Sequence, residues 1–196
     1  MHKRFEHHVR WGLFLVICGV GCRTEPIPKP RAYFRIDLPE QTYTTWHAPN
    51  SLTAEIPAYA VIRPGRSENR SKWYDLHFPG QRAIVHLTHS TVEDDLFALI
   101  EDAHAFKTTH EEKAARILRD RILRPDAHVF GTVFDVDGDV ASPMVFYVTD
   151  STDHFLYGAL YFNTRPNADS LAPVTERIRA DVRHLLSTLE WHGPAK

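Results

Sequence analysis

Cysteine is nearly absent from this chain of 196 residues, which contains only Cys18 and Cys22. Both lie near the N-terminus, so no disulfide framework can hold the rest of the chain together, and the fold must rest on its core. Glycine is scarce too, and neither a phosphate-cradling glycine loop nor a G-x-S-x-G nucleophile elbow occurs. The formal net charge is −2 with no basic block, so we expect no nucleic-acid partner.

The chain also lacks an apolar run long enough to span a bilayer, which takes about 20 residues as a helix. Its N-terminus has instead the layout of a secretory signal peptide, with a basic start, a short apolar stretch and small residues before Cys22. Gly21 before Cys22 fits a bacterial lipoprotein signal, whereas bulky Ile17 before Cys18 does not. We expect a signal peptide at 1–21 and lipid attachment at Cys22. A signal cut by the general peptidase, or an uncleaved anchor, is the alternative.

A proline-rich segment follows the lipid site. Prolines at positions 26, 28 and 30 each fix φ and restrict the residue before them, which favours an extended polyproline II conformation. We expect residues 22–31 to form a lipidated linker, stiff or flexible, and residues 32–192 to form a single domain. The leader holds three basic residues and one acidic residue, so its removal shifts the formal net charge from −2 to −4.

The domain alternates strand and helix patterns. Period-two segments predict strands at 52–57, 73–78, 83–89, 129–136, 144–149 and 155–163. A capping box at Ser90–Glu93 predicts a helix to about residue 112, and an apolar stripe predicts a second helix over 170–191, capped by Asp169 or Ser170 with Pro173 in its first turn. Residues 116–124 fit a helix end or a strand equally.

The order of these elements predicts an α+β fold. The second and third strands form a hairpin around Pro79-Gly80, and the last three form a meander with Asp137-Gly138 between the first two. The antiparallel sheet would pack against the helices. Similar orders occur in the Mog1/PsbP-like fold, which is an analogy at the level of the fold only.

Histidines invite a search for a metal site. His86 and His89 form an H-x-x-H pair, but residues three apart on a strand point to opposite faces. His77 can join His86 across the hairpin, with Asp75 as a possible third ligand, and zinc needs at least three. We interpret these residues as ordinary polar strand residues and expect no metal and no cofactor.

Two acidic segments resemble functional motifs. FDVDGDV, at 134–140, starts like a calcium loop, but its glycine comes too early and Phe146 occupies the closing position. DSTDH, at 150–154, places a serine, an aspartate and a histidine in one tight turn, where they cannot converge as a triad normally does. We interpret both as turns and expect no enzyme. The alternative is a periplasmic metal-dependent hydrolase that uses His77, His86 and a carboxylate, or a small-ligand-binding lipoprotein.

Two stretches carry a family likeness: PKPRAYFRIDLPE at 28–40 and HFLYGALYFNTRPNADSLAPV at 154–174. Together with PAYA at 57–60, they resemble the GldD family of gliding motility lipoproteins, over about residues 28–191. The resemblance implies an outer-membrane lipoprotein that faces the periplasm. It also implies a role with other envelope proteins of the gliding machinery and the type IX secretion system, without a known catalytic residue.

The resemblance suggests contact residues as well. Arg31, Tyr33, Arg35 and Arg165 lie in the two long motifs, and each arginine must either pair with an acidic residue or face a partner. Arginine and tyrosine dominate protein interfaces, so these four are our candidates for partner binding. Relatives often carry cysteines near the positions of Asn50 and Lys72, which implies that a disulfide has been lost here.

Overall fold

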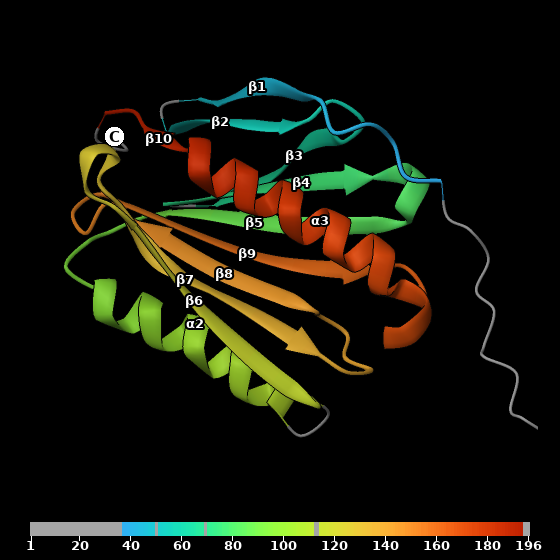
Figure 1. The fold of residues 1–196 in the computed structure, drawn as a ribbon. Coiled ribbons are helices and arrows are strands. Elements are labelled where there is room, and N and C mark those ends of the chain that lie inside the picture. The colour runs from blue at the N-terminus through green and yellow to red at the C-terminus, as the bar shows by residue number, and fades with distance from the viewer. Residues whose placement is uncertain (1–36, 50, 69, 112–113, 194–196) are drawn as a thin grey trace, which may run out of the picture. The chain divides into compact units, whose positions relative to one another are not determined.

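Two antiparallel sheets and two helices make up the part of the chain that this computed structural model describes, residues 37–49, 51–68, 70–111 and 114–193 (Figure 1). The small sheet has the order β1-β2-β10, with β1 at Tyr43–Ala48, β2 at Leu52–Pro57 and β10 at Glu190–Trp191. The predicted α+β class is confirmed. No helix among these residues is long and apolar enough to cross a membrane.

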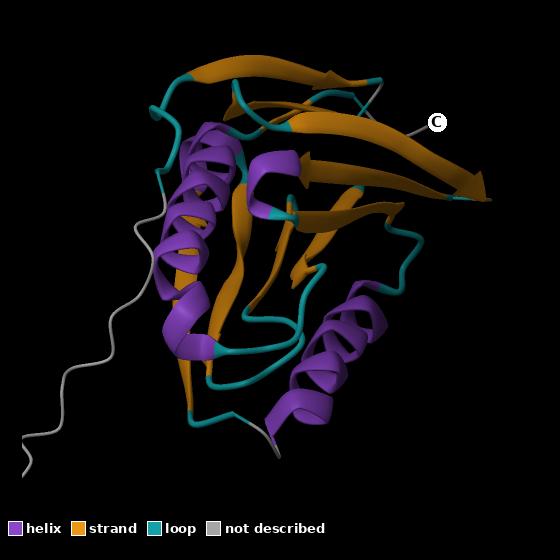
Figure 2. Cartoon of the chain, turned by 90° about the vertical axis from the view of Figure 1, so that its right-hand side faces the viewer, coloured by secondary structure: helices purple, strands orange, loops and turns teal. Residues whose placement is uncertain are grey.

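The large sheet has seven strands in the order β3-β4-β5-β9-β8-β7-β6. Every neighbouring pair in it is antiparallel. The strands are β3 (Val61–Glu68), β4 (Ser71–Phe78), β5 (Ala83–Thr91), β6 (Arg116–Arg124), β7 (Val129–Asp137), β8 (Met144–Thr149) and β9 (His154–Phe162). The two helices are α2 (Leu96–Glu111) and α3 (Ala168–Thr188), and they lie on opposite faces of this sheet (Figure 2).

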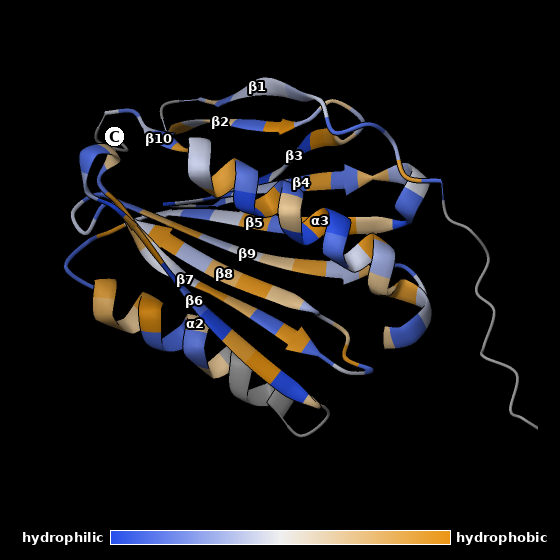
Figure 3. Ribbon diagram, viewed as in Figure 1, coloured by the Kyte–Doolittle hydropathy of each residue, from blue (hydrophilic) through white to orange (hydrophobic). Residues whose placement is uncertain are grey.

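The main core lies between α3 and the large sheet. The predicted apolar stripe of α3 is buried there: Ile178, Val182 and Leu185 are each at most 1% exposed. They belong to one cluster with the inward residues of β4, β5 and β9. Figure 3 shows the alternation of apolar and polar residues along α3 that produces this one-sided burial. Each fully buried aliphatic side chain contributes roughly 1.5–3 kcal/mol.

A smaller core lies between α2 and the opposite face. Ala103 of α2 packs there with Phe134, Tyr147 and Phe155, and Leu96 and Ile100 pack at its margin. Because both faces of β8 are covered, all six of its residues are buried, and its sequence MVFYVT reads as a continuous apolar run. The strand predicted at 144–149 is therefore confirmed with the same bounds.

Close packing between β8 and β9 requires a glycine. A Cβ added at Gly158 would lie 2.1 Å from the ring of Phe146, which is 1% exposed and faces Gly158 in the strand register. The ring fills the space above the glycine, so β9 can lie against a large aromatic residue without a gap.

Two hairpins of the large sheet are connected in the same way. A proline-started 3-10 turn, η1 (Pro79–Gln81) or η2 (Pro125–Ala127), is followed by a left-handed residue at φ near 50°, Arg82 or His128. The first confirms the hairpin predicted around Pro79-Gly80. The second joins β6 to β7 and shows that the ambiguous residues 116–124 form a strand at the edge of the sheet.

Several local predictions are wrong. Ser90 does not cap a helix, because β5 continues to Thr91 through pairing with β9, and α2 begins only at Leu96. The cap of α3 is Asn167, whose side chain accepts from the amide of Ser170.

The bounds and turns around α3 and β7 also differ from the prediction. The helix starts earlier than predicted, so Pro173 lies in its second turn, and it ends at Thr188, after which 190–191 form β10. The strands on either side of Asp137-Gly138 do pair, but their connection is longer than a two-residue turn. Strands β1 and β3 were not predicted.

Candidate functional site

The structure brings together the three residues of the hypothetical metal site. Asp75 on β4 lies directly opposite His86 on β5, and His86 Nδ1 is 2.6 Å from Asp75 Oδ1. His77 Nε2 lies 3.9 Å from the other carboxylate oxygen of Asp75. One carboxylate therefore sits between two imidazoles on an exposed face, as the hairpin predicted.

This triplet does not have the geometry of a metal centre. Within the described residues, no group of three or more histidine, cysteine, aspartate or glutamate side chains is placed to hold a metal ion. The shared carboxylate of Asp75 already bonds to His86, and the diagonal position of His77 keeps the two imidazoles apart. The arrangement orients His86, as a carboxylate partner does in second shells and dyads.

A broader open face surrounds the triplet. Side chains at alternate positions of β4, β5 and β9 point to the α2 side of the large sheet, where α2 packs on β8 and β9. Away from α2, the face carries side chains that are exposed or half-buried. Four of them have rings, if the two imidazoles are counted. The side chains are those of Trp73, Asp75, His77, Ile84, His86 and Tyr161. The His86 and Tyr161 rings lie 5.5 Å apart. We call these six residues the open face.

The DSTDH segment is a turn, as predicted. The carboxylate of Asp150 accepts hydrogen bonds from the backbone amides of Thr152, Asp153 and His154, each at 2.9 Å. Burial raises the pKa of Asp150, but the three amide donors outweigh this effect and hold its pKa below the ordinary value. Its Oδ1 atom is therefore committed to the turn.

Two of the three acidic residues of FDVDGDV, Asp135 and Asp137, are paired with arginines, and the third, Asp139, accepts from the backbone amide of Ala168 at 2.8 Å. Arg179 of α3 is 7% exposed, and its guanidinium pairs with Asp135, Asp137 and Glu176 and donates to the carbonyls of Val136 and Pro143. Arg183 pairs with Asp135 as well. These carboxylates join β7 to α3. The segment was interpreted as a turn, but residues 134–137 form the end of β7, and only the residues after Asp137 leave the strand.

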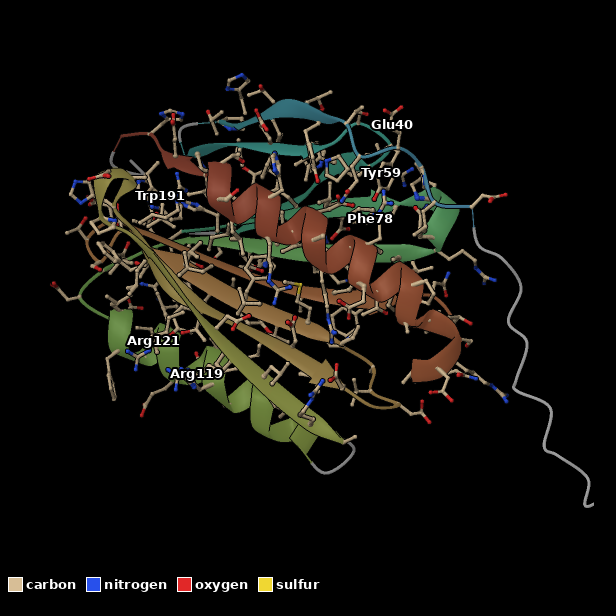
Figure 4. The ribbon with its side chains drawn as sticks, in the orientation of Figure 1. Glu40, Tyr59, Phe78, Arg119, Arg121 and Trp191 are labelled. Carbon is tan, nitrogen blue, oxygen red and sulfur yellow. The ribbon has the colours of Figure 1, made fainter. Side chains whose placement is uncertain are left out.

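A buried histidine pair lies at the other end of the sheet. His89 Nε2 is 3.0 Å from His154 Nδ1, and both side chains are at most 2% exposed. His154 Nε2 contacts the carbonyl of Gly193, and its ring stacks on Trp191 at 5.1 Å (Figure 4 labels Trp191). A carbonyl can only accept, so His154 carries its proton on Nε2 and accepts on Nδ1 from His89. Burial, followed by the repulsion between His89 and His154 in their protonated forms, lowers the pKa of His89 to about 4.

Two tyrosines hold a buried aspartate of α3. Asp181 is 0% exposed and accepts from the hydroxyls of Tyr43, at 3.0 Å, and Tyr59. Gln41 adds a longer bond of 3.4 Å. Burial and the bond to Asp181 raise the pKa of Tyr43 to about 12 and raise that of Tyr59 further, so both phenols remain donors. This Asp181 group joins β1 and the PAYA segment to α3, and sequence reasoning missed it.

One protein-family model matches most of the chain. The model described as "Gliding motility lipoprotein GldD" matches residues 23–191. The chain belongs to the GldD family. No curated protein and no solved structure matches it. The family assigns the chain to the gliding motility lipoproteins and confirms the resemblance that the two long motifs carry.

The described parts of the family motifs contact α3 or lie at its start. From the first motif, Leu38 packs against the main core, and the carbonyl of Pro39 accepts from Arg177 of α3 at 2.7 Å. Tyr59 of PAYA binds Asp181 and packs edge-on against Phe78 (Figure 4). Asn167 of the second motif caps α3. The described parts of all three GldD motifs therefore meet around α3.

Among the predicted lipid-attachment and partner-contact residues, the structure describes only Arg165. Cys22, Arg31, Tyr33 and Arg35 lie outside the described residues, whereas Arg165 is exposed in the connection between β9 and α3. Of the two positions at which the resemblance suggested a lost disulfide, Asn50 also lies outside the described residues. Lys72 donates to the carbonyl of Pro49 at 3.1 Å and lies 3.4 Å from Ser51 Oγ, so its ammonium bridges β4 to the β1–β2 turn.

Proposed function

We propose that this GldD-family chain is a lipid-anchored, non-catalytic adaptor. It binds other envelope proteins of the gliding machinery and of the type IX secretion system on the periplasmic side of the outer membrane. The observation that carries the proposal is the open face, where Trp73, Tyr161 and His86 are presented on a rigid sheet. Aromatic side chains on a rigid platform are the usual anchors of protein interfaces.

The local chemistry supports binding over catalysis. The Asp75–His86 pair resembles a general base with its orienting acid, and covalent catalysis by such a pair would also need a side-chain nucleophile within about 3 Å. Ala159 of β9 lies directly opposite His86. Thr88, the next residue of β5 on the same face, lies about 7 Å from His86 along the strand. The other acids and histidines described above are bound in turns, salt bridges or buried pairs.

The anchor is part of the proposal. Lipid attached to Cys22 would hold the domain at the membrane through the proline-rich linker, and several acyl chains on one cysteine would make the anchor durable. Cys18 offers a matched control, because we expect it to leave with the signal peptide. Arg31, Tyr33, Arg35 and Arg165 remain proposed contact residues beside the open face.

A deletion strain tests the adaptor role. We expect it to lose gliding, and the secretion of proteins that depend on the type IX system, and we expect wild type and Cys18→Ala to restore both. Cys22→Ala should be made but fail to restore them, because it lacks its anchor. Normal gliding and a normal secreted-protein profile in the deletion strain would refute the proposal, and equal rescue by Cys22→Ala would refute the anchor.

The enzyme alternative has its own test. A metal-dependent hydrolase using His77, His86 and Asp75 would carry stoichiometric zinc after purification under mild conditions, and His86→Ala would lose it. We expect less than about 0.1 zinc per chain under the same conditions, since zinc sites need three good ligands. A stoichiometric, His86-dependent metal would overturn the non-catalytic proposal.

The small-ligand alternative has limited room. A cleft of about 220 Å³ lies between α2 and the sheet, lined by Thr88, Ser90, Leu99, Ala103, Phe155 and their neighbours. This is below the roughly 300–1,000 Å³ of typical small-molecule sites. Its lining includes the polar residues Thr88, Ser90, Asp102 and Tyr157, so it is the small volume that does not favour a carrier function.

A further inference from the structure

The two edges of the large sheet differ in their capacity to pair with another strand. At one edge, β3 contains Pro64, which has no amide hydrogen to donate, and its register with β4 shifts between Pro64 and Ser67. Prolines and bulges are devices by which edge strands avoid pairing. At the other edge, β6 has no proline, glycine or bulge, and all nine of its residues pair with β7 in one register.

Strand β6 is therefore ready to accept a strand. In an antiparallel edge strand, about half of the backbone amides and carbonyls point away from the sheet. Among the described elements, β7 is the only strand that pairs with β6. Leu118 and Leu123 on β6 are 44% and 66% exposed, so the edge also offers apolar contacts. Free backbone groups beside exposed apolar side chains are the features used in strand addition.

The charge of β6 is strongly positive. Its sequence, RILRDRILR, contains four arginines and one aspartate. Arg116 pairs with Asp137, Asp120 pairs with Arg183, and Arg124 donates to carbonyls at the end of α3. The other two arginines, Arg119 and Arg121, are more available to bind a partner.

Arg119 and Arg121 lie on one face of β6, together with Leu123. The guanidinium of Arg119 lies 5.9 Å from the centre of the Phe134 ring, and Arg121 makes no ion pair within the described residues. Figure 4 labels both beside the strand. Because they are two positions apart, their Cα atoms are about 7 Å apart, which matches alternate residues of an added strand.

A second copy of the chain is a poor occupant. A two-fold axis that continues the sheet through two copies of β6 must place some residue opposite itself. Centred on Asp120, the pairing sets Arg119 against Arg121 of the copy and Asp120 against itself. Centred on Arg119 or Arg121, it sets an arginine against itself. Like charges directly opposite each other destabilise a strand pair. Centred on Leu118 or Ile122, the pairing instead sets Asp120 against Arg116 or Arg124 of the copy, but it leaves no carboxylate opposite Arg119 or Arg121.

The N-terminal part of this chain is also a poor occupant. Between Cys22 and the first described residue it carries Arg23, Lys29, Arg31 and Arg35 against the single acid Glu25. A segment with this charge would be repelled by β6. Charge complementarity therefore points to an acidic strand from another protein.

We propose that β6 is a docking edge for an extended acidic segment of a partner protein. The segment adds as an eighth strand of the large sheet, with carboxylates opposite Arg119 and Arg121 and an apolar side chain opposite Leu123. The proposal rests on the adaptor function and specifies the chemistry by which one partner is held.

Binding can be tested on the purified mature chain with two defined peptides. One is a blocked, fluorescently labelled nonapeptide in which glutamate alternates with threonine, and the other has lysine in place of glutamate. We expect fluorescence anisotropy to show at least tenfold tighter binding of the glutamate peptide. Hydrogen exchange should slow at the outward amides of β6 and stay unchanged in β3. The difference should shrink with added salt, because exposed charges are screened.

Charge reversal locates the binding. Arg121→Glu, and the double change Arg119→Glu with Arg121→Glu, should weaken the glutamate peptide at least tenfold and favour the lysine peptide. The matched control reverses Arg63 and Arg66 on β3 and should change neither affinity. Equal effects of the β3 and β6 reversals would overturn the proposal. The proposal would also be overturned if no peptide bound to wild type and Arg121→Ser increased self-association. The arginines would then serve only to prevent aggregation.

The same variants separate this proposal from the adaptor function. Arg121→Glu in the deletion strain should reduce gliding while the protein is present at wild-type levels. The docking edge would be overturned, and the adaptor role retained, by three results together. These are a deletion strain that fails to glide, no peptide binding, and full rescue of gliding by Arg121→Glu. Normal gliding in the deletion strain, combined with peptide binding at β6, would overturn the adaptor role alone.

Discussion

The buried histidine pair makes stability depend on pH in a calculable way. In the folded chain, His89 donates to His154, and His154 donates to the carbonyl of Gly193, so each imidazole needs only one proton. The Nδ1 atom of His89 is buried and has no hydrogen-bond partner among the described residues, and a proton added there would place an unsolvated charge beside His154 and Lys72. For this reason the folded pKa of His89 is about 4, against an ordinary value of 6.5.

The sign of the effect follows from proton linkage. Between pH 6.5 and 4 the unfolded chain binds a proton at His89 that the folded chain does not, so acidification favours unfolding. The contribution of neutral His89 is complete above pH 6.5 and is lost as the pH falls toward 4. With the two pKa values above, the loss is about 1.4 kcal/mol at pH 5.5 and roughly 2.5 kcal/mol at pH 4.5.

The measurement compares variants, because carboxylates also titrate in this range. Unfolding by denaturant is measured at pH 7.5, 5.5 and 4.5. We expect His89→Leu to be less stable than wild type at pH 7.5. On acidification it should lose less stability than wild type does, by about 1.4 kcal/mol at pH 5.5 and roughly 2.5 kcal/mol at pH 4.5. Val85→Ala, which changes a buried aliphatic residue of the same strand and removes no titratable group, should keep a constant difference from wild type at every pH. Parallel pH profiles for wild type and His89→Leu would refute the reasoning.

Three further changes test the packing and the buried polar groups, each by the free energy of unfolding at pH 7.5. Gly158→Ala should cost about 1–3 kcal/mol or more, because its Cβ would meet the buried Phe146 ring, whereas Gly80→Ala has open space and should change stability by less than about 1 kcal/mol. Tyr59→Phe should cost about 1.5–3 kcal/mol by removing a donor from buried Asp181, and a smaller loss than for Tyr161→Phe would contradict the Asp181 group. Arg179→Met should cost about 3–5 kcal/mol, since it leaves buried Asp135 with one fewer cation, and a neutral result would contradict the network.

The parts of the fold that follow from local pattern were predictable. The helix α3 and the strands β8 and β9 each carry an apolar period that depends only on which faces are covered, so their type and approximate bounds can be read from the sequence. The approach of His77 and Asp75 to His86 was also predictable, because a hairpin with a short turn fixes which residues lie opposite each other.

The parts that depend on distant residues were not predictable. Ser90 has the sequence of a helix cap, but pairing with Phe155 of β9 keeps it in a strand, so tertiary structure overrides the local signal. The Asp181 group joins residues 122 and 138 positions apart, and no periodicity records such a separation. The only available hint was that Tyr59 lies in a family motif. Strand β3 is polar and contains Pro64, so it lacks the alternation by which strands are recognised.

The ambiguity of residues 116–124 has a physical origin that bears on their use. Ile117 and Ile122 are five positions apart, which puts them on opposite faces of a strand. The structure shows that Ile117 packs against the core under α2 and Ile122 against the core under α3. Strand β6 is thus held from both faces while its outer edge stays open. A partner strand would then bear only its own ordering cost on docking, because the receiving edge is already fixed.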